Sequence, residues 1–595
     1  MGTPMPGGGR HRRRIRIALP VAAAGAAAAV TAALLTTSAG AAAALPQPPV
    51  RPATSSPSLA ELEKRIAGAM SGDDTAGRTS KASLSADTGP SRIDPKIIGG
   101  TETTISTAPW MAQLHYYDKR GTSTTSDDIG FFCGGAVVAP TKILTAAHCV
   151  KGYNWNANGV VVTGTSELPS DGGTDLHGGV AKPVLRQWSH PSYNATTIDN
   201  DIALLTLPEP VRATPIRMTT SGDTASYQAG TSAKVYGWGR TSSTSDDISE
   251  TLKTATLPIQ SDTTCAGAYG SDFVKGHMVC AGKPATGSDT GTTTACNGDS
   301  GGPLVVNNRI VGVVSWGVTD CVAKGAYSVF SKVSTYVGAA YPRVDDTNIN
   351  GDHRADLWVR NASTKTGYSK NSKGTSFDAR ESWGDWGGVN LLLQADLDRD
   401  GYQDVVYRRS SDGDVFWGSG RTGATRQIAD NWKTRTRIIT PGDVTGDYLP
   451  DLLSVDSAGV MWIYPGKGDG TFAPRVQVGS GWNQYNSVRG HGDFTGDGKT
   501  DLIARSSSGG YLYLYKGTGK AGSGAFSARV KVRTWDGYNA FDAPGDVTGD
   551  GKADFLARTP GGTLYLYAGT GKATSEIFAT RMSVGTDFEQ YDIFG

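Results

Sequence analysis

The chain is best understood from the stretch Asn297-Gly298-Asp299-Ser300-Gly301-Gly302-Pro303, which follows Cys296 and precedes the apolar run Leu304-Val305-Val306. A serine hydroxyl is a poor nucleophile at its ordinary pKa, so a nucleophilic serine needs a base beside it. Flanking glycines allow a substrate carbonyl to approach backbone N–H groups closely. The stretch therefore predicts a nucleophile, Ser300, and a histidine elsewhere in the chain that serves it.

One of the eight histidines stands in a matching context, His148 in Leu144-Thr145-Ala146-Ala147-His148-Cys149. A third group must orient the ring of the base, and the candidate is Asp201 in Asp199-Asn200-Asp201-Ile202-Ala203-Leu204-Leu205. Taken alone, His148 would be read as an ordinary core histidine. The three motifs together favour a Ser-His-Asp triad, in the chain order His, Asp, Ser.

Residues 97 to about 340 resemble the trypsin and chymotrypsin family of serine endopeptidases. The resemblance rests on several separate motifs: Ile97-Ile98-Gly99-Gly100, Cys133-Gly134-Gly135, Thr145–Cys149, Asp201-Ile202-Ala203-Leu204, Gly237-Trp238-Gly239, the Ser300 stretch and Ser315-Trp316-Gly317. It implies two antiparallel β-barrels with the triad in the crevice between them. It also implies that the N–H groups of Gly298 and Ser300 form the oxyanion hole and that catalysis needs no cofactor.

Composition indicates several domains of mostly β structure, because the 595 residues include 79 glycines and few long apolar helical patterns. The formal net charge of +1 gives no case for a nucleic-acid partner.

The N-terminus has the pattern of an export signal over residues 1–44. A basic cluster, Arg10–Arg16, precedes the alanine-rich run Ile17–Leu35 and small residues at 41–44. A membrane anchor is the alternative, although alanine is weakly apolar. Arg12-Arg13-Arg14 also raises twin-arginine export. We expect a secreted, extracellular protein.

All six cysteines lie between Cys133 and Cys321. An even number in an exported chain indicates disulfides, and six cysteines allow fifteen pairings. The family resemblance selects Cys133–Cys149, Cys265–Cys280 and Cys296–Cys321.

Residues 45–96 are rich in Ala, Ser, Thr, Pro and Gly, with one helix-compatible segment at Leu59–Ala69. They are typical of a propeptide that ends at Lys96. The resemblance implies that a cut between Lys96 and Ile97 frees an amine that pairs with Asp299 and orders the oxyanion loop. The uncut chain is then a zymogen.

The resemblance places Thr294, Gly317 and Ser328 in the specificity pocket. Trypsin has an aspartate at the position of Thr294, so this pocket is expected to be neutral and to favour uncharged P1 residues. Asp320 is the nearby acid that would restore a basic preference; its alternative role is a solvated loop charge. With a neutral pocket, activation after Lys96 needs another protease.

Five related blocks follow, a pattern expected to occupy residues 345–595. They are Asn348–Asp356, Asp396–Asp404, Asp443–Asp451, Asp493–Asp501 and Asp546–Asp554, with starts 48, 47, 50 and 53 residues apart. This period is typical of propeller blades, and the blocks resemble FG-GAP or VCBS-type repeats. The whole chain is thus expected to be all-β, a chymotrypsin-like double barrel followed by a propeller.

Oxygen-bearing side chains recur at positions 1, 3, 5 and 9 of the blocks, which is the chemistry of calcium. The alternative for each block is a metal-free turn held by hydrogen bonds. Calcium is favoured most in the second block, since threonine at position 3 weakens the later three and asparagines weaken the first. The expected ligands are Asp396, Asp398, Asp400, Asp404, Asp443, Asp447, Asp451, Asp493, Asp497, Asp501, Asp546, Asp550 and Asp554.

Alternating strands such as Tyr511–Tyr515 follow the blocks, with leucines on one face and tyrosines on the other. We expect the tyrosines to pack between neighbouring blades; stacking on sugars is the alternative. The tail Thr586–Gly595 is expected to pair with the first repeat and close a ring of five blades. An incomplete larger propeller is the alternative.

The sequence thus predicts a secreted serine endopeptidase, made as a zymogen, that cleaves proteins or peptides. Its propeller is expected to bind substrate or a carbohydrate or cell-surface ligand. The alternatives are a catalytically unused, calcium-dependent adhesin or lectin, and an acyl esterase.

Overall fold

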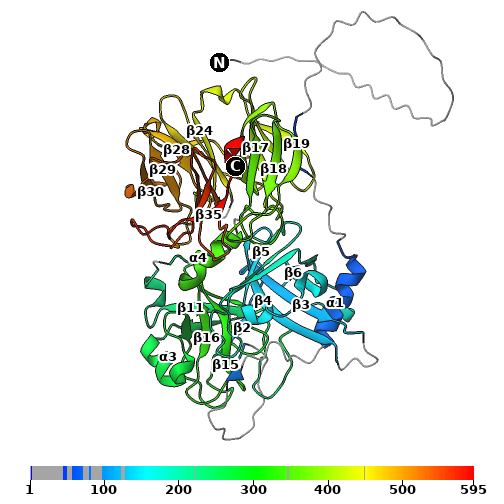
Figure 1. Ribbon diagram of the computed structural model, residues 1–595. Coiled ribbons are helices and arrows are strands. Elements are labelled where there is room, and N and C mark those ends of the chain that lie inside the picture. Colours follow the sequence, from blue (N-terminus) through cyan, green and yellow to red (C-terminus); the bar gives the residue numbers. More distant parts are fainter. Residues whose placement is uncertain are drawn as a thin grey trace, which may run out of the picture. The chain divides into compact units, whose positions relative to one another are not determined.

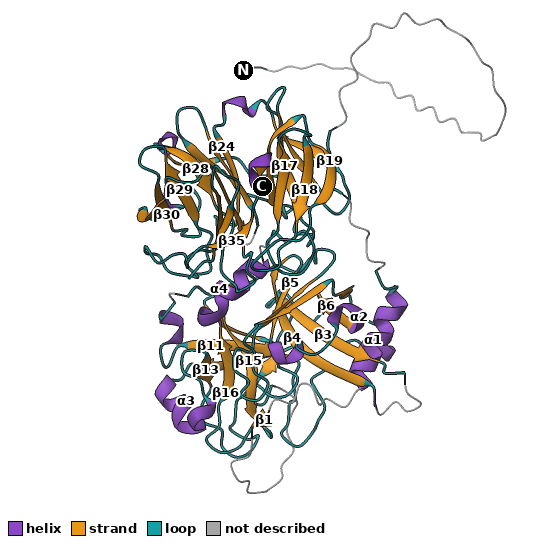
Figure 2. Cartoon of the chain, viewed as in Figure 1, coloured by secondary structure: helices purple, strands orange, loops and turns teal. Residues whose placement is uncertain are grey.

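The computed structural model describes Gly2 and residues 45–49, 56–71, 80–81, 97–121, 127–221, 223–344, 347–447 and 449–595. The rest of the expected export signal and Lys96 lie outside these ranges. Strands predominate (Figure 2), as expected from the composition, and the prediction of an all-β chain is confirmed. Within the described residues, none of the helices has the length and apolar character to span a membrane.

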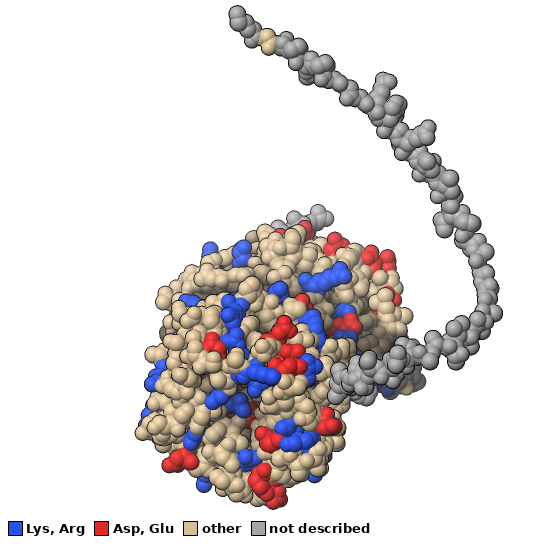
Figure 3. Space-filling view, turned by 90° about the horizontal axis from the view of Figure 1, so that it is seen from above, with Lys and Arg blue, Asp and Glu red and all other residues tan. Residues whose placement is uncertain are grey.

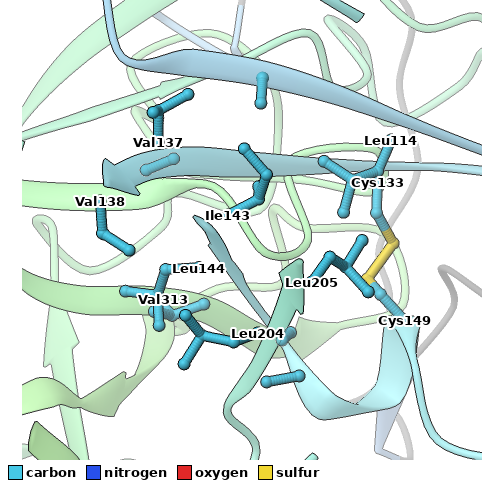
Figure 4. Close-up of a cluster of buried hydrophobic side chains, with 14 of the residues drawn as sticks. Leu114, Cys133, Val137, Val138, Ile143, Leu144, Cys149, Leu204, Leu205 and Val313 are labelled. Atoms are coloured by element: carbon cyan, nitrogen blue, oxygen red, sulfur yellow. A yellow bond between two sulfur atoms is a disulfide. The ribbon is translucent and has the colours of Figure 1, made fainter. Parts of the chain in front are cut away.

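The first sheet of the protease region has the order β7-β6-β3-β4-β5-β9-β8, with every neighbouring pair antiparallel. Its β-branched and aromatic runs favour strands, and the side chains of Leu114, Val137, Ile143 and Leu205 meet in its core (Figure 4). The strands are β3 (Met111–Asp118), β4 (Ile129–Ala139), β5 (Lys142–Thr145), β6 (Gly159–Thr163), β7 (Val180–Pro183), β8 (Arg186–Ser189) and β9 (Ala203–Thr206).

The second sheet has the order β13-β16-β15-β14-β11-β12-β2, and β10 and β1 pair in parallel with β15. A separate core lies against it, with Val235, Leu257 and Leu304 fully buried. The strands are β1 (Ser80–Lys81), β2 (Thr101–Glu102), β10 (Arg217–Met218), β11 (Ser232–Gly237), β12 (Lys253–Pro258), β13 (Met278–Ala281), β14 (Pro303–Val306), β15 (Arg309–Val318) and β16 (Ser328–Lys332).

Four α-helices complete the described part of this region. They are α1 (Leu59–Ser71), α2 (Trp155–Asn158), α3 (Asp262–Tyr269) and α4 (Val333–Val344). The helix α1 confirms the helix expected in the propeptide segment. The helix α4 continues to Val344, and its last turn is held by packing, since Tyr341 and Val344 are buried.

The three disulfides implied by the resemblance are all present: Cys133–Cys149, Cys265–Cys280 and Cys296–Cys321. The first joins β4 to the turn that carries His148 (Figure 4). The last joins the Ser300 loop to the segment that follows β15.

Residues 347–595 form five four-stranded antiparallel blades (Figure 1). The blades are β36 (Tyr591–Phe594), β17 (Leu357–Asn361), β18 (Thr366–Lys370) and β19 (Glu381–Asp385); β20 (Val389–Ala395), β21 (Asp404–Arg409), β22 (Val415–Gly418) and β23 (Thr425–Ala429); β24 (Arg437–Gly442), β25 (Asp451–Val455), β26 (Met461–Tyr464) and β27 (Val476–Gly479); β28 (Tyr485–Arg489), β29 (Leu502–Ser506), β30 (Tyr511–Tyr515) and β31 (Val530–Thr534); β32 (Ala540–Gly545), β33 (Asp554–Arg558), β34 (Leu564–Tyr567) and β35 (Met582–Gly585).

The tail closes the ring, as predicted. The C-terminal strand β36 pairs with β17, with Val359 opposite Phe594 and Arg360 opposite Ile593. Each Asp-rich block precedes the second strand of its blade. The first block precedes β17, and the first strand of that blade is the C-terminal strand β36, so strands from both ends of the propeller complete it. The prediction of five blades is confirmed.

The tyrosines and leucines of β30 lie on opposite faces of the strand, as expected. Leu512 and Leu514 are fully buried, while the rings of Tyr513 and Tyr515 contact Tyr485 and Trp482. Trp482 lies in the turn before β28, and Tyr485 is the first residue of that strand. Tyr513 and Tyr515 pack against a buried cluster that also contains Leu453 and Ile463 of the third blade, so the expected packing between neighbouring blades is confirmed here.

Candidate active site

The pairing of β5 with β9 brings His148 and Asp201 together. His148 lies in the turn after β5, Asp201 lies just before β9, and Thr145 is opposite Ala203 in that strand pair. The backbone N–H of His148 donates to Asp201 Oδ1 at 2.8 Å, and His148 Nδ1 lies 2.8 Å from Asp201 Oδ2. One buried carboxylate therefore holds both the backbone and the ring of the histidine.

Two serines of the second sheet also hold Asp201. Ser315 Oγ donates to Asp201 Oδ2 at 2.6 Å, and Ser331 Oγ donates to the Asp201 carbonyl oxygen at 2.6 Å. Ser331 stands in no motif that assigned it a role, and Ser315 was recognised only as part of the motif Ser315-Trp316-Gly317. Their function depends on contacts across the two sheets, which local patterns do not reveal.

Ser300 lies in the loop before β14 and is 5% exposed. Its carbonyl oxygen accepts a hydrogen bond from the N–H of Gly134 at 2.8 Å, which anchors the serine loop to β4 of the first sheet. His148 Nε2 is buried, with no hydrogen-bond partner among the described residues. The nitrogen opposite the one held by Asp201 is therefore available to accept a proton.

The cluster of Cys133, His148 and Cys149 brings three potential metal-binding atoms close together. Both sulfurs are bonded to each other in a disulfide, so neither is the thiolate that a metal would need. This cluster is not a metal site.

The glycines of the serine loop are required by close contacts. Gly298 has φ +90°, and a Cβ there would lie 2.8 Å from Ile248 Cγ2 and 3.0 Å from Gly239 Cα. A Cβ on Gly301, whose φ is +82°, would lie 2.2 Å from Thr145 Oγ1. Only glycine fits both positions without displacement of a neighbour.

Asp299 is completely buried beside the serine. Its carboxylate accepts hydrogen bonds from the N–H groups of Gly239 at 2.8 Å and Cys296 at 2.9 Å. Burial raises the pKa of Asp299 to about 7, against these two donors. Ile97, the first residue after the expected cut, is also fully buried and belongs to the core of the second sheet.

Two of the expected pocket residues, Thr294 and Ser328, form a hydrogen bond with each other. Thr294 Oγ1 lies 2.7 Å from Ser328 Oγ, which also accepts the N–H of Ala295 at 2.9 Å. A Cβ on Gly317 would meet open space. None of the described residues lining the cavity beside Ser300 is acidic. Asp320 instead accepts the N–H groups of Val322 and Ala323, as a turn-forming loop residue.

The last aspartate of each block has a backbone role. These residues are fully buried, and each accepts N–H groups from its own loop and from the turn after the third strand, as Asp451 does from Val444, Thr445 and Gly466. The others are Asp356, Asp404, Asp501 and Asp554. This clamp was not predicted from the sequence.

The second block gathers the most carboxylates. Oxygens of Asp396, Asp398 and Asp404 lie within 4.8 Å of one another. Burial and the charges of Asp396 and Asp398 raise the pKa of Asp400 to about 8. This loop offers the oxygen donors that calcium prefers.

In the fifth block, a buried arginine pairs with the first aspartate. The guanidinium of Arg343, at the end of α4, pairs with Asp546, and both side chains are buried.

Over the face seen in Figure 3, acidic and basic side chains are mixed, which gives that face no extended field of one sign.

The comparisons with known proteins cover both regions. The family described as Trypsin matches residues 97–339, and the family described as FG-GAP-like repeat matches residues 493–557. A trypsin of Saccharopolyspora erythraea is 38% identical over 240 residues, which span 40% of this chain and 94% of that protein. Kallikrein-14 of Homo sapiens is 36% identical over 245 residues, 40% of this chain and 81% of its own length. A trypsin of Sus scrofa is 31% identical over 248 residues, which span 42% of this chain and 95% of that protein.

Proposed function

This chain belongs to the trypsin family of serine endopeptidases, and from that premise we propose that it is a secreted zymogen with the triad Ser300, His148 and Asp201. Export is supported by the signal-like N-terminus and by three disulfides, which persist in oxidising compartments. Its substrates are proteins or peptides.

In the proposed mechanism, Ser300 Oγ attacks the carbonyl carbon of the scissile bond while His148 Nε2 takes its proton and later returns it to the leaving amine. Asp201 holds the ring and stabilises the imidazolium. The N–H groups of Gly298 and Ser300 stabilise the oxyanion. The observation that carries this proposal is the His148 ring, held by Asp201 at Nδ1 and buried without a described partner at Nε2.

Activation is proposed to follow a cut between Lys96 and Ile97 by another protease. Asp299 is a fully buried carboxyl with no described cation beside it, and Ile97 lies in the adjoining core. A free Ile97 amine would supply the missing charge, since an unpaired buried charge is costly. The ion pair would then hold the loop that carries Gly298 and Ser300.

The pocket is proposed to take uncharged P1 side chains. Thr294 and Ser328 offer hydroxyls but no negative charge, and Asp320 is used by its own loop. A buried lysine or arginine would have no counter-charge there.

The propeller is proposed to bind calcium in the second block and to bind a substrate, carbohydrate or cell-surface ligand. Asp396, Asp398, Asp400 and Asp404 would hold the ion, which would neutralise the clustered carboxylates and stiffen the loop. The third and fourth blocks carry fewer carboxylates, and the pairing of Asp546 with Arg343 reduces the need for an ion in the fifth.

The test is cleavage of a peptide library by the protein with a free Ile97 amine, with Ser300→Ala as control. We expect cleavage after uncharged residues that is absent in the control. Cleavage after lysine or arginine would overturn the pocket assignment but not the triad. No cleavage and no fluorophosphonate labelling of Ser300 would favour the adhesin alternative.

A further inference from the structure

The helix α1 of the propeptide segment is built to pack against another surface. Ser58 caps it by accepting the N–H of Glu61 at 3.2 Å, and Glu61 pairs with Arg65 one turn later. Leu62, Ile66 and Ala69 form one apolar stripe at helical spacing and are buried. Leu59, the first residue of the same helix, is 58% exposed.

The surface under that stripe belongs to the first sheet of the protease (Figure 1). Leu62 and Ile66 pack against Val160 and Val162 of β6, and Leu176 adds to the same cluster. Arg65 Nη1 also donates to the carbonyl oxygen of Gly159 at 3.4 Å. The contact therefore combines apolar burial with a backbone hydrogen bond.

Two glycines allow this contact to be close. A Cβ on Gly68 of α1 would lie 2.2 Å from Cγ of Tyr117 in β3. On the other side, a Cβ on Gly173 would lie 2.6 Å from the carbonyl oxygen of Glu63. Larger residues at either position would push the helix away, so the two surfaces are complementary in shape.

This contact does not depend on the bond between Lys96 and Ile97. The helix ends at Ser71, and the cluster around Leu62 and Ile66 includes neither Ile97 nor any of the three triad residues. A short isolated helix is marginal in water, so α1 in a released fragment would unfold and expose its apolar stripe. A propeptide that remains bound to the protease avoids both the unfolding of α1 and the exposure of its apolar stripe.

The same segment makes a second contact. The strand β1 pairs with the end of β15, with Ser80 opposite Gly317 and Lys81 opposite Val318. Gly317 and Val318 line the cavity beside Ser300. The propeptide segment is therefore held on both sheets of the protease.

We propose that the propeptide stays bound to the protease after activation, as a separate chain held through α1 in the site formed by β3, β6 and Gly173. This inference rests on the proposed cut before Ile97. The mature protein is then a non-covalent complex of the protease with its own propeptide.

The test uses the full secreted chain, cut to give a free Ile97 N-terminus that is verified by N-terminal sequencing. The cut protein is passed over a sizing column without denaturant, and the peptide that contains α1 is quantified by mass spectrometry. We expect near-stoichiometric co-elution in the wild type. If Ile97 is never freed, the proposed activation fails; if it is freed and the α1 peptide separates, this inference fails alone.

The variants Leu62→Asp and Leu59→Asp make a matched pair, since both place the same charge near the start of the same helix. Leu62→Asp should reduce co-elution at least about tenfold, because it buries a carboxylate without a partner. Leu59→Asp should co-elute like the wild type. Co-elution of both variants would overturn the role of α1.

Hydrogen exchange supplies a measurement that needs no variant. The amides of α1 should remain protected in the cut wild-type protein and should exchange at the rate of an unfolded peptide once the fragment is separated. Unprotected α1 amides in the cut protein would refute the inference even if Leu62→Asp fails to fold.

Discussion

Replacing Gly298 with alanine tests the oxyanion loop directly. The residue has φ +90°, so alanine there carries a backbone strain of about 1–3 kcal/mol. Its Cβ would also lie 2.8 Å from Ile248 Cγ2 and 3.0 Å from Gly239 Cα. Both contacts are shorter than or at the limit of real Cβ contacts, so the loop must shift away from Gly239.

That shift moves the N–H of residue 298, which is the proposed donor to the oxyanion. Loss of one such donor costs about 2.7–4 kcal/mol, or about 10²–10³ in kcat. The donor acts on the transition state rather than on the bound substrate, so KM should change little. Gly298→Ala should therefore lower kcat and kcat/KM by similar factors.

Gly325→Ala is the matched control. Gly325 lies in the same domain with φ +85°, and a Cβ there would meet nothing within 4 Å. It carries the backbone strain without the clash. The assay is steady-state hydrolysis of a chromogenic peptide by the activated protein, with active-site titration to count competent sites.

A Gly298→Ala protein whose kcat stays within about threefold of the wild type would refute this role of the Gly298 N–H. It would also be refuted if Gly325→Ala lost as much activity, because the effect would then come from backbone strain alone.

Three further predictions concern other parts of the chain. Thr294→Asp should shift P1 preference toward lysine and arginine by supplying a counter-charge, seen as a higher ratio of kcat/KM for Lys over Leu substrates; an unchanged ratio would contradict the pocket assignment. In the uncut Ser300→Ala chain, burial raises the pKa of Asp299 from 3.8 to about 7. The neutral form is thus favoured in the folded state, and Asp299 should lower the free energy of unfolding by a few kcal/mol between about pH 4 and 7. In denaturant titrations Asp299→Asn should make the slope with pH shallower by that amount, while other buried carboxyls with raised pKa values, such as Asp400, keep their own contribution. EDTA should lower the melting temperature of residues 347–595 more than that of the protease, and this decrease should be smaller in Asp398→Asn. An unchanged melting temperature in EDTA, measured by calorimetry, would remove the calcium proposal.

The propeller illustrates what could be predicted from local patterns. The spacing of the Asp-rich blocks predicted five blades, and the short tail predicted closure onto the first repeat, because each blade is one supersecondary unit with a recognisable turn. The blocks did not reveal that their last aspartates clamp the backbone, since some partner N–H groups, such as that of Gly466 for Asp451, lie beyond the next strand.

Around Ser300, sequence motifs identified the serine, histidine and aspartate of the proposed triad, and the family resemblance identified the cysteine pairs. Such residues stand in short motifs whose glycines and neighbours are constrained locally. The contact of Ser331 with Asp201, the pairing of Asp546 with Arg343 and the packing of α1 on β6 became visible only in the folded chain. The residues in these contacts are 94 or more apart in the sequence, and no local pattern encodes a partner that only folding brings within reach.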